Sequence, residues 1–206
     1  MKKYELTSET KVINGVELHR IKALESFGNV KKGELGGWIE SEKNLSQYED
    51  AWVYENATVG GNATIRGNAT VCGYATVGGD ATVSGDATVS DNAWVGGNAI
   101  VGGYAKVGDN AWVGGNARVG GNATVRETAD FIVFKNWWSS GRYFTWTRSN
   151  NKWKVGCFYG SGEELIAKAY EDSEKSGREY ERVVKYVESI LKEENNDDGK
   201  RNKREG

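Results

Sequence analysis

The sequence has few of the residues that stabilise small secreted domains or carry catalysis. Its 206 residues include no proline, two cysteines and one histidine. Cys72 and Cys157 are too few for a disulfide framework and lack the spacing of a metal site. No run of eighteen apolar residues exists, so no membrane-spanning helix is expected. The N-terminus opens onto no apolar stretch, so we expect no signal peptide and a cytoplasmic protein.

An excess of one sign of charge is also lacking. The formal net charge is −2, which argues against a chain-wide attraction to nucleic acid or to an anionic membrane. Hydrophobic residues make up only 38% of the chain, whereas glycine is abundant at 28 residues. A short repeat with few core residues per unit explains both numbers without disorder.

The chain does contain a strict six-residue period. From Ala51 to Ala129 an alanine falls on every sixth residue, and Val or Ile follows two places after each one up to Val125. A fixed period carried this far specifies a repeat architecture. In most units Gly followed by Asn, Asp or Tyr stands between the aliphatic residue and the next alanine, and Gly and Asn tolerate the backbone of a tight corner. Each unit is therefore predicted to be a short strand followed by a sharp turn.

The period predicts a column of stacked coils. Each strand is expected to hydrogen-bond to the coils above and below, about 4.8 Å away. Leu35-Gly36-Gly37-Trp38-Ile39-Glu40 overlays a later hexad, and the degenerate hexads from Ser41 and Gln47 continue its phase. Residues 35–130 then form about five coils at three hexads per coil.

This pattern of an aliphatic residue, glycine, two corner residues, a small residue and an outward residue resembles the hexapeptide-repeat family. The fold of that family is a left-handed parallel β-helix. The resemblance implies the triangular cross-section, the left-handedness and a homotrimer, because a six-residue period alone fixes none of them.

Three hexads per coil place residues eighteen apart above one another. The predicted outward columns are Thr58, Thr76, Trp94 and Trp112; Trp52, Thr70, Thr88, Lys106 and Thr124; and Thr64, Thr82, Ile100 and Arg118. Two tryptophans stacked on a flat face are costly to leave in water. Trp94 and Trp112 are therefore candidate binding residues. They pack either in a subunit interface, or under the C-terminal domain, or as an aromatic platform for a ligand.

Both ends of the repeat need caps, because an exposed coil is a sheet edge. Asn14-Gly15 between β-prone arms predicts an N-terminal hairpin. After Ala129, three predicted strands (131–134, 142–147 and 153–158) precede two helices that begin near the capping-box sequences at Ser161 and Ser176. We expect a mainly β fold with four parts: an N-terminal hairpin cap (1–34), a left-handed parallel β-helix (35–130), a small C-terminal α+β domain (131–194) and a disordered polar tail (195–206).

The predicted C-terminal strands carry basic and aromatic residues. Every charged residue between Phe131 and Gly160 is basic, and aromatic residues lie among them. This mixture can bind an anionic ligand that stacks, such as a nucleotide or single-stranded nucleic acid. The alternative is a small aromatic core with solvated lysines. The candidate binding residues here are Trp137, Trp138, Arg142, Arg148, Lys152 and Lys154.

The sequence favours a binding protein over an enzyme. Many hexapeptide-repeat proteins are trimeric acyltransferases whose catalytic histidine lies in or beside the coils. Here His19 precedes the repeat and no loop interrupts residues 51–129, so no general base is evident. An acyltransferase-like enzyme acting at a trimer interface is the alternative. We expect no catalytic residue, no metal and no cofactor.

The segments Gly33–Glu40 and Gly156–Gly160 also resemble those of hexapeptide-repeat proteins from phages and prophages. The resulting hypothesis is a non-enzymatic scaffold, a phage or prophage accessory protein in the host bacterial cytoplasm. As an oligomer it would bind or sequester a host protein or a nucleotide-like anionic ligand.

Overall fold

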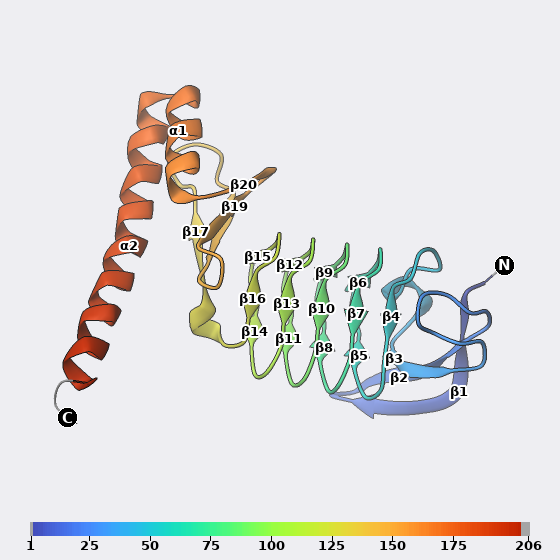
Figure 1. Cartoon of the computed structure of the whole chain (residues 1–206). Coiled ribbons are helices and arrows are strands. Elements are labelled where there is room, and N and C mark those ends of the chain that lie inside the picture. Colours follow the sequence, from blue (N-terminus) through green and yellow to red (C-terminus); the bar gives the residue numbers. More distant parts are fainter. Residues whose placement is uncertain (1, 203–206) are drawn as a thin grey trace. The chain divides into compact units, whose positions relative to one another are not determined.

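The computed structural model describes the backbone of residues 2–202 and the side chains of residues 2–194. The chain forms two compact units. One contains the residues up to Lys135 together with Tyr143–Tyr159, and the other contains Asn136–Arg142 together with the residues from Gly160 onward. The first unit is a parallel β-solenoid of about five coils with an antiparallel hairpin at its N-terminal end (Figure 1). The predicted β-helix architecture is confirmed.

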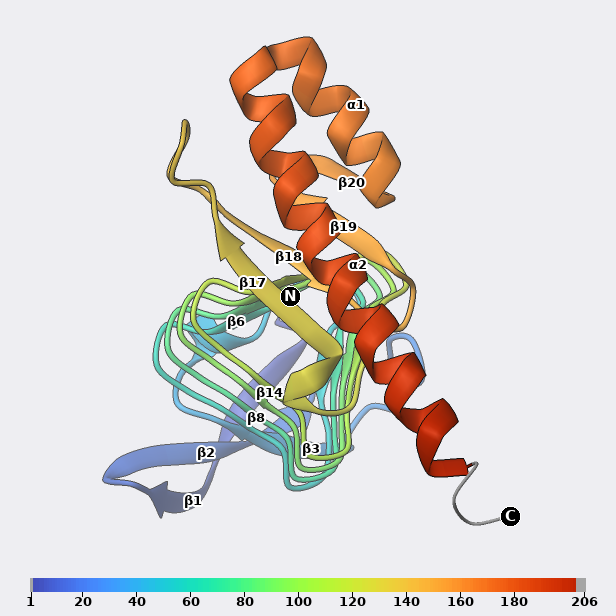
Figure 2. The same cartoon turned by 90° about the vertical axis from the view of Figure 1, so that its left-hand side faces the viewer.

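Three parallel sheets form the walls of the solenoid, and we call them faces A, B and C. Face A contains β3, β5, β8, β11 and β14; face B contains β6, β9, β12 and β15; face C contains β4, β7, β10, β13 and β16. Successive coils superpose in the view of Figure 2. The strands are β3 (Leu35–Ile39), β4 (Trp52–Val53), β5 (Thr58–Val59), β6 (Thr64–Ile65), β7 (Thr70–Val71), β8 (Thr76–Val77), β9 (Thr82–Val83), β10 (Thr88–Val89), β11 (Trp94–Val95), β12 (Ile100–Val101), β13 (Lys106–Val107), β14 (Trp112–Val113), β15 (Arg118–Val119) and β16 (Thr124–Val125).

The solenoid interior consists of the alanine and aliphatic positions of the repeat. Val77 and Val95 lie on adjacent strands of face A, and both are fully buried. Backbone hydrogen bonds join the coils: the Thr76 amide donates to the Ala93 carbonyl at 2.9 Å, and the Gly78 amide donates to the Val95 carbonyl at 2.9 Å. The eighteen-residue stacking predicted for the outward columns is confirmed, with Thr58 opposite Thr76, Thr76 opposite Trp94, and Trp94 opposite Trp112.

The predicted phase at the start of the solenoid is wrong by two residues. Ile39 pairs with Val59, twenty residues later, whereas Val53 pairs with Val71, eighteen residues later. Ile39 therefore fills the aliphatic position, and Gly37 fills the alanine position. A Cβ on Gly37 would lie 2.7 Å from the Ala57 carbonyl oxygen, so this position has no room for a side chain. The two extra residues belong to the segment between Leu45, which bridges Ile65, and Val53.

A buried lysine holds the segment that contains this insertion. The Lys3 ammonium donates to the backbone carbonyls of Glu49 at 3.0 Å and Ala51 at 2.9 Å. Burial lowers the pKa of Lys3 to about 8, although the carboxylates of Asp50, Glu49 and Glu25 oppose this shift. The hydrogen bonds of Lys3 thus attach the N-terminal strand to the first coil, and burial disfavours the charged form of this lysine.

The predicted hairpin caps the first coil. It consists of β1 (Tyr4–Ile13) and β2 (Val16–Ala23), joined at Asn14 and Gly15, whose φ angles of 51° and 80° suit a type I′ turn. Strand β2 pairs antiparallel with β3, so the hairpin continues face A. Tyr4 and Phe27 pack edge-on against Trp52 with ring centroids 6.1 and 5.4 Å away, and Trp52 is fully buried. This member of a predicted outward column is covered by the cap.

An antiparallel sheet covers the last coil. Its strands lie in the order β17 (Phe131–Lys135), β18 (Tyr143–Thr147), β19 (Lys152–Val155) and β20 (Phe158–Gly160). The Arg118 amide donates to the Thr145 hydroxyl at 2.8 Å, and the Thr124 amide donates to the Ser149 hydroxyl at 2.8 Å. These bonds satisfy amides that no further coil could pair. The strand predicted at 153–158 is divided by a turn at Gly156, where φ is 57°.

The helices belong to the second unit, together with Asn136–Arg142. They are α1 (Gly162–Asp172), which begins with the predicted capping box at Ser161, and α2 (Glu174–Asn202). Short 3₁₀ helices η1 (Glu42–Asn44) and η2 (Thr128–Asp130) lie in the first unit. Among the described residues, no helix is long and apolar enough to cross a membrane.

The domain limits of the structure differ from the expected ones. The sequence predicts one C-terminal domain at 131–194, yet β17, β18 and β19 belong to the same compact unit as the solenoid, because β18 and its following turn bond to the last coil. Helix α2 extends to Asn202, into the stretch 195–206 that the sequence predicts to be disordered. Residues 203–206 of that stretch lie outside the described residues.

Candidate binding surface on face A

Two stacked tryptophans form the centre of the candidate site. Trp94 and Trp112 occupy the same outward column on consecutive coils, with ring centroids 4.8 Å apart and planes inclined by 54°. Trp94 is half-buried, whereas Trp112 is 61% exposed. A Cβ on Gly96 would lie 2.1 Å from the Trp94 ring, so the indole covers this glycine. The glycine corner of the repeat thus gives the large side chain room to lie along the wall.

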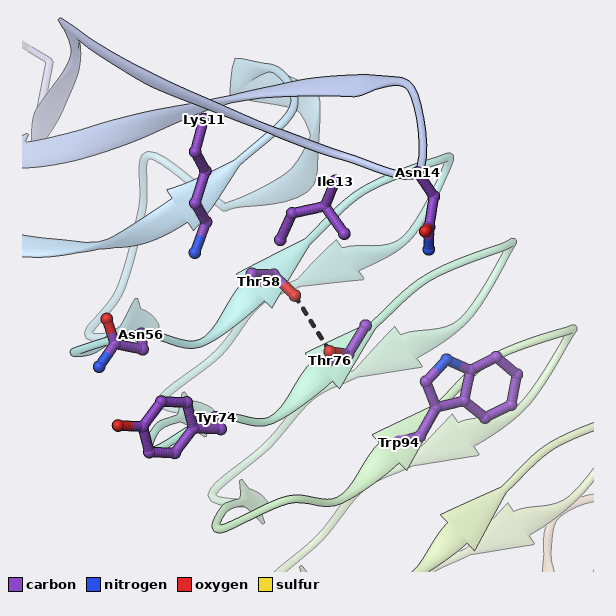
Figure 3. Close-up of a pocket in the computed structure, with 8 residues that line it drawn as sticks. All are labelled: Lys11, Ile13, Asn14, Asn56, Thr58, Tyr74, Thr76 and Trp94. Atoms are coloured by element: carbon purple, nitrogen blue, oxygen red, sulfur yellow. Dashed lines mark hydrogen bonds between the residues drawn. The ribbon is translucent and has the colours of Figure 1, made fainter.

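A groove separates Trp94 from the tip of the N-terminal hairpin (Figure 3). Its volume is about 440 Å³, which lies within the range of small-molecule sites. On face A its floor includes Thr58, whose hydroxyl donates to the Thr76 hydroxyl at 3.1 Å. The hairpin, the face and the adjoining corner all contribute to the lining, which consists of Lys11, Ile13, Asn14, Asn56, Thr58, Tyr74, Thr76 and Trp94.

Two cations on the arms of the hairpin pack on the ring of Trp38. Lys11 Nζ lies 4.4 Å from the centroid of the Trp38 ring, and the Arg20 guanidinium carbon lies 5.4 Å from the same centroid. Burial, and secondarily the charge of Arg20, lower the pKa of Lys11. Arg20 also donates to the Gly36 carbonyl at 3.2 Å and lies 3.5 Å from a Glu9 carboxylate oxygen. The two cations and the indole fix the hairpin on the first coil of face A.

The hairpin tip is apolar and exposed. Val12 is 68% exposed, and Ile13 and Val16 are exposed as well. The tip and the tryptophan pair therefore form two apolar patches on the same wall of the solenoid. We call the groove, the tip residues Val12, Ile13 and Val16, and the pair Trp94 and Trp112 the face A surface.

The predicted C-terminal site residues are divided between the two compact units. Trp137, Trp138 and Arg142 belong to the second compact unit, whereas Arg148, Lys152 and Lys154 belong to the first. Trp137 is 72% exposed, and Trp138 is buried with its ring 4.9 Å from that of Tyr180.

The three basic residues of the first unit have different surroundings. The Arg148 guanidinium lies 5.8 Å from the centroid of the Trp146 ring. Lys152 is half-buried at the start of β19, and its amide bonds to the Asn150 side chain at 3.2 Å. Lys154 lies beside Gly120 of the last coil.

The aromatic-core alternative describes most of the C-terminal sheet. Phe144, Trp146 and Trp153 are fully buried. The Phe134 ring lies 5.5 Å from that of Phe144 and 5.8 Å from that of Trp153. These aromatic residues stabilise the sheet and are not available to a ligand.

Sequence reasoning missed the hairpin residues Lys11, Ile13 and Asn14 and the corner residue Tyr74 as members of the groove. The hairpin was predicted, but nothing in the period indicates which wall it continues. Its pairing with β3 decides this.

The comparisons with known proteins agree with this geometry. Residues 81–97 match the family model described as the YdcK beta solenoid repeat. The match covers most of one coil, from β9 through β11, and includes Trp94.

The chain is a β-solenoid repeat protein.

No curated protein sequence matches it. Within the described residues, no group of three or more His, Cys, Asp or Glu side chains is placed to hold a metal ion. His19 lies in β2, half-buried and paired with Ile39 of β3.

Proposed function

We propose that this β-solenoid protein is a non-enzymatic binding and scaffold protein that assembles with copies of itself through the face A surface. One observation carries the proposal. Trp94 and Trp112 form a stacked pair on a flat wall, and Trp112 is 61% exposed to solvent. Contiguous exposed apolar surface of this kind marks a contact site in a folded protein.

The position of the two apolar patches supports a second copy as the occupant. The hairpin tip and the tryptophan pair lie on the same wall but at different coils, on either side of Thr76. In a closed homo-oligomer, one patch of each copy can contact the other patch of its neighbour. The tip at Ile13 would then contact Trp112 of the next copy, and both apolar patches would be buried from solvent. The resemblance to hexapeptide-repeat proteins favours three copies.

A solenoid is suited to this role, because each coil contacts only its neighbours and the wall stays rigid. An oligomer would display several identical C-terminal units. Binding through several units at once would give avidity for a partner even where each single contact is weak. In keeping with the resemblance to phage and prophage proteins, we propose that the bound factor is a host protein or a small anionic ligand.

The oligomeric mass tests the proposal. Multi-angle light scattering should give wild-type protein a multiple of the 22.6 kDa chain mass. The double variant Trp94→Thr, Trp112→Thr should be monomeric, because it removes both indoles from the contact. Threonine already occupies this column at Thr58 and Thr76, so the variant should keep the fold.

Trp137→Thr is the matched control, because it removes an exposed indole from the other compact unit. This variant should keep the wild-type mass. A monomeric wild type, or a double variant that stays oligomeric, would overturn the proposed contact. Acetyl-CoA turnover that disappears in His19→Ala would instead support the acyltransferase-like alternative.

A further inference from the structure

A second pocket lies on face B at the last two coils. Its volume is about 310 Å³, at the lower end of the range for small-molecule sites. The solenoid contributes residues from β12, β15 and the corners that follow them, and the C-terminal sheet contributes Lys154 of β19 and Tyr159 of β20. We call it the Arg118 pocket. Its lining consists of Ile100, Gly102, Gly103, Arg118, Val119, Gly120, Gly121, Lys154 and Tyr159.

The charge of the Arg118 pocket is unbalanced. Arg118 and Lys154 both line it, and none of the other lining residues is acidic. Among the described residues, neither side chain forms an ion pair with a carboxylate, unlike Lys2, Arg20 and the paired cations of α1 and α2. Two like charges in one pocket repel each other, and an anion placed between them removes this cost.

The rest of the pocket is shaped by missing side chains and by one fixed ring. Four glycines leave the wall open, and Ile100 gives it an apolar patch. The Tyr159 ring lies against Gly121, where a Cβ would be only 2.1 Å from the ring. The Tyr159 hydroxyl donates to Asn122 Oδ1 at 3.1 Å and accepts from Asn150 Nδ2 at 3.0 Å. The ring is therefore held in place before any ligand arrives.

Arg118 is also a departure from the repeat. Its column holds Thr64 and Thr82 on earlier coils and Ile100 on the preceding one. The arginine appears only on the coil that the C-terminal sheet covers, where Lys154 can share the pocket with it.

We propose that the Arg118 pocket binds a small phosphate-bearing ligand with a planar or apolar body, about the size of a mononucleotide. Arg118 and Lys154 hold the anionic group, because a guanidinium presents paired donors to phosphate and an ammonium adds a point charge. Tyr159 and Ile100 contact the body of the ligand. This site is separate from the face A surface and does not depend on the proposed oligomer.

Isothermal titration calorimetry at low ionic strength tests the site with three probes: adenosine 5′-monophosphate (AMP), inorganic phosphate and adenosine. AMP should bind more tightly than phosphate or adenosine, because it supplies both the anion and the body. Arg118→Thr and Lys154→Gln should each weaken AMP binding about tenfold or more, as expected when a hydrogen bond to a charged group is lost. Tyr159→Ala should weaken the binding of AMP but leave the binding of phosphate unchanged.

Lys106→Thr is the matched control. It removes one positive charge from the outward column of face C and restores the threonine found at Thr88 of that column. This variant should bind AMP as wild type does, and circular dichroism should show that every variant keeps the fold. Absence of AMP binding, equal binding of AMP and adenosine, or an equal loss in Lys106→Thr would overturn the proposal.

Discussion

Two glycines at equivalent corners offer a sensitive test of how the coils stack. Gly97 and Gly115 both have φ of +61° and both follow a strand of face A. A Cβ on Gly97 would lie 2.9 Å from the amide nitrogen and 3.0 Å from the carbonyl oxygen of Gly115, whereas a Cβ on Gly115 would meet nothing within 4 Å. Substitution by alanine therefore imposes the same backbone strain at both positions but crowds the next coil at only one.

The expected magnitudes follow from these distances. Holding a non-glycine residue in the left-handed region costs about 1–2 kcal/mol, which is the whole effect expected for Gly115→Ala. Gly97→Ala adds overpacking against a backbone that cannot rotate away, at about 1–3 kcal/mol. Chemical denaturation should therefore give Gly97→Ala a free energy of unfolding about 1–3 kcal/mol below that of Gly115→Ala. The melting temperatures should differ by about 2–4 °C per kcal/mol.

At another corner, aspartate forms a hydrogen bond to the next coil that alanine cannot form. Asp91 and Asp109 adopt φ of 57° and 51° on consecutive coils, and the Asp109 amide donates to Asp91 Oδ2 at 3.1 Å. That bond offsets the crowding, so Gly97→Asp should be less destabilising than Gly97→Ala although its side chain is larger. Equal losses of stability in Gly97→Ala and Gly115→Ala would refute the close stacking of these corners.

Three further predictions concern the core, the cap and the insertion. Val95→Asp should abolish cooperative thermal unfolding followed by circular dichroism, because it buries an unpaired charge in the solenoid, and a melt like that of wild type would contradict the inward position of Val95. Lys3 should make wild-type stability rise with pH between 8 and 10 relative to Lys3→Met, because the pKa of Lys3 in the fold is about 8 against an ordinary value of 10.5, so the unfolded form of this group binds more protons in this range. Lys3→Met should reduce that rise, and an unchanged slope would mean that Lys3 does not cause it. Deleting two residues between Leu45 and Val53 should destabilise the cap, measured by hydrogen exchange of the β1 amides, because the Lys3 contacts to Glu49 and Ala51 would be lost; unchanged β1 protection would show that those contacts do not hold the cap.

The period alone was enough to predict most of the solenoid. The alanine at every sixth residue and the aliphatic residue two places after it define inward positions. Adding eighteen residues at a time then gives the outward column of Thr58, Thr76, Trp94 and Trp112. The prediction failed upstream because the Gly-Gly pair at Gly36 and Gly37 looks like a corner but belongs to strand β3. The spacing of aliphatic residues carries the better signal: Ile39 and Leu45 are six apart, and Val53 follows after eight.

The position of the hairpin and the grouping of the pocket residues depend on long-range contacts, which the sequence pattern does not reveal. The hairpin was predicted from Asn14-Gly15, but its place beside face A follows from pairing with β3. Lys154 was predicted as a binding residue within a wide basic and aromatic set. Its partner Arg118 lies on another element, 36 positions earlier, so only the fold brings the two together. Trp146 and Trp153 lie in the same stretch of basic and aromatic residues but are buried in the sheet core, because alternate residues of a strand face opposite sides.

Disulfide cross-linking tests the central claim, that copies meet through the face A surface, most directly. In a Cys72→Ser, Cys157→Ser background, one tagged chain carries Ile13→Cys at the hairpin tip and a second carries Asn110→Cys at the exposed corner just before Trp112, so both tryptophans remain. Mild oxidation of the mixed oligomer should give a reducible heterodimer. Replacing Asn110→Cys by Tyr104→Cys, on the corner between faces B and C, should give none. No heterodimer from the first pair, or equal yields from both pairs, would contradict the account.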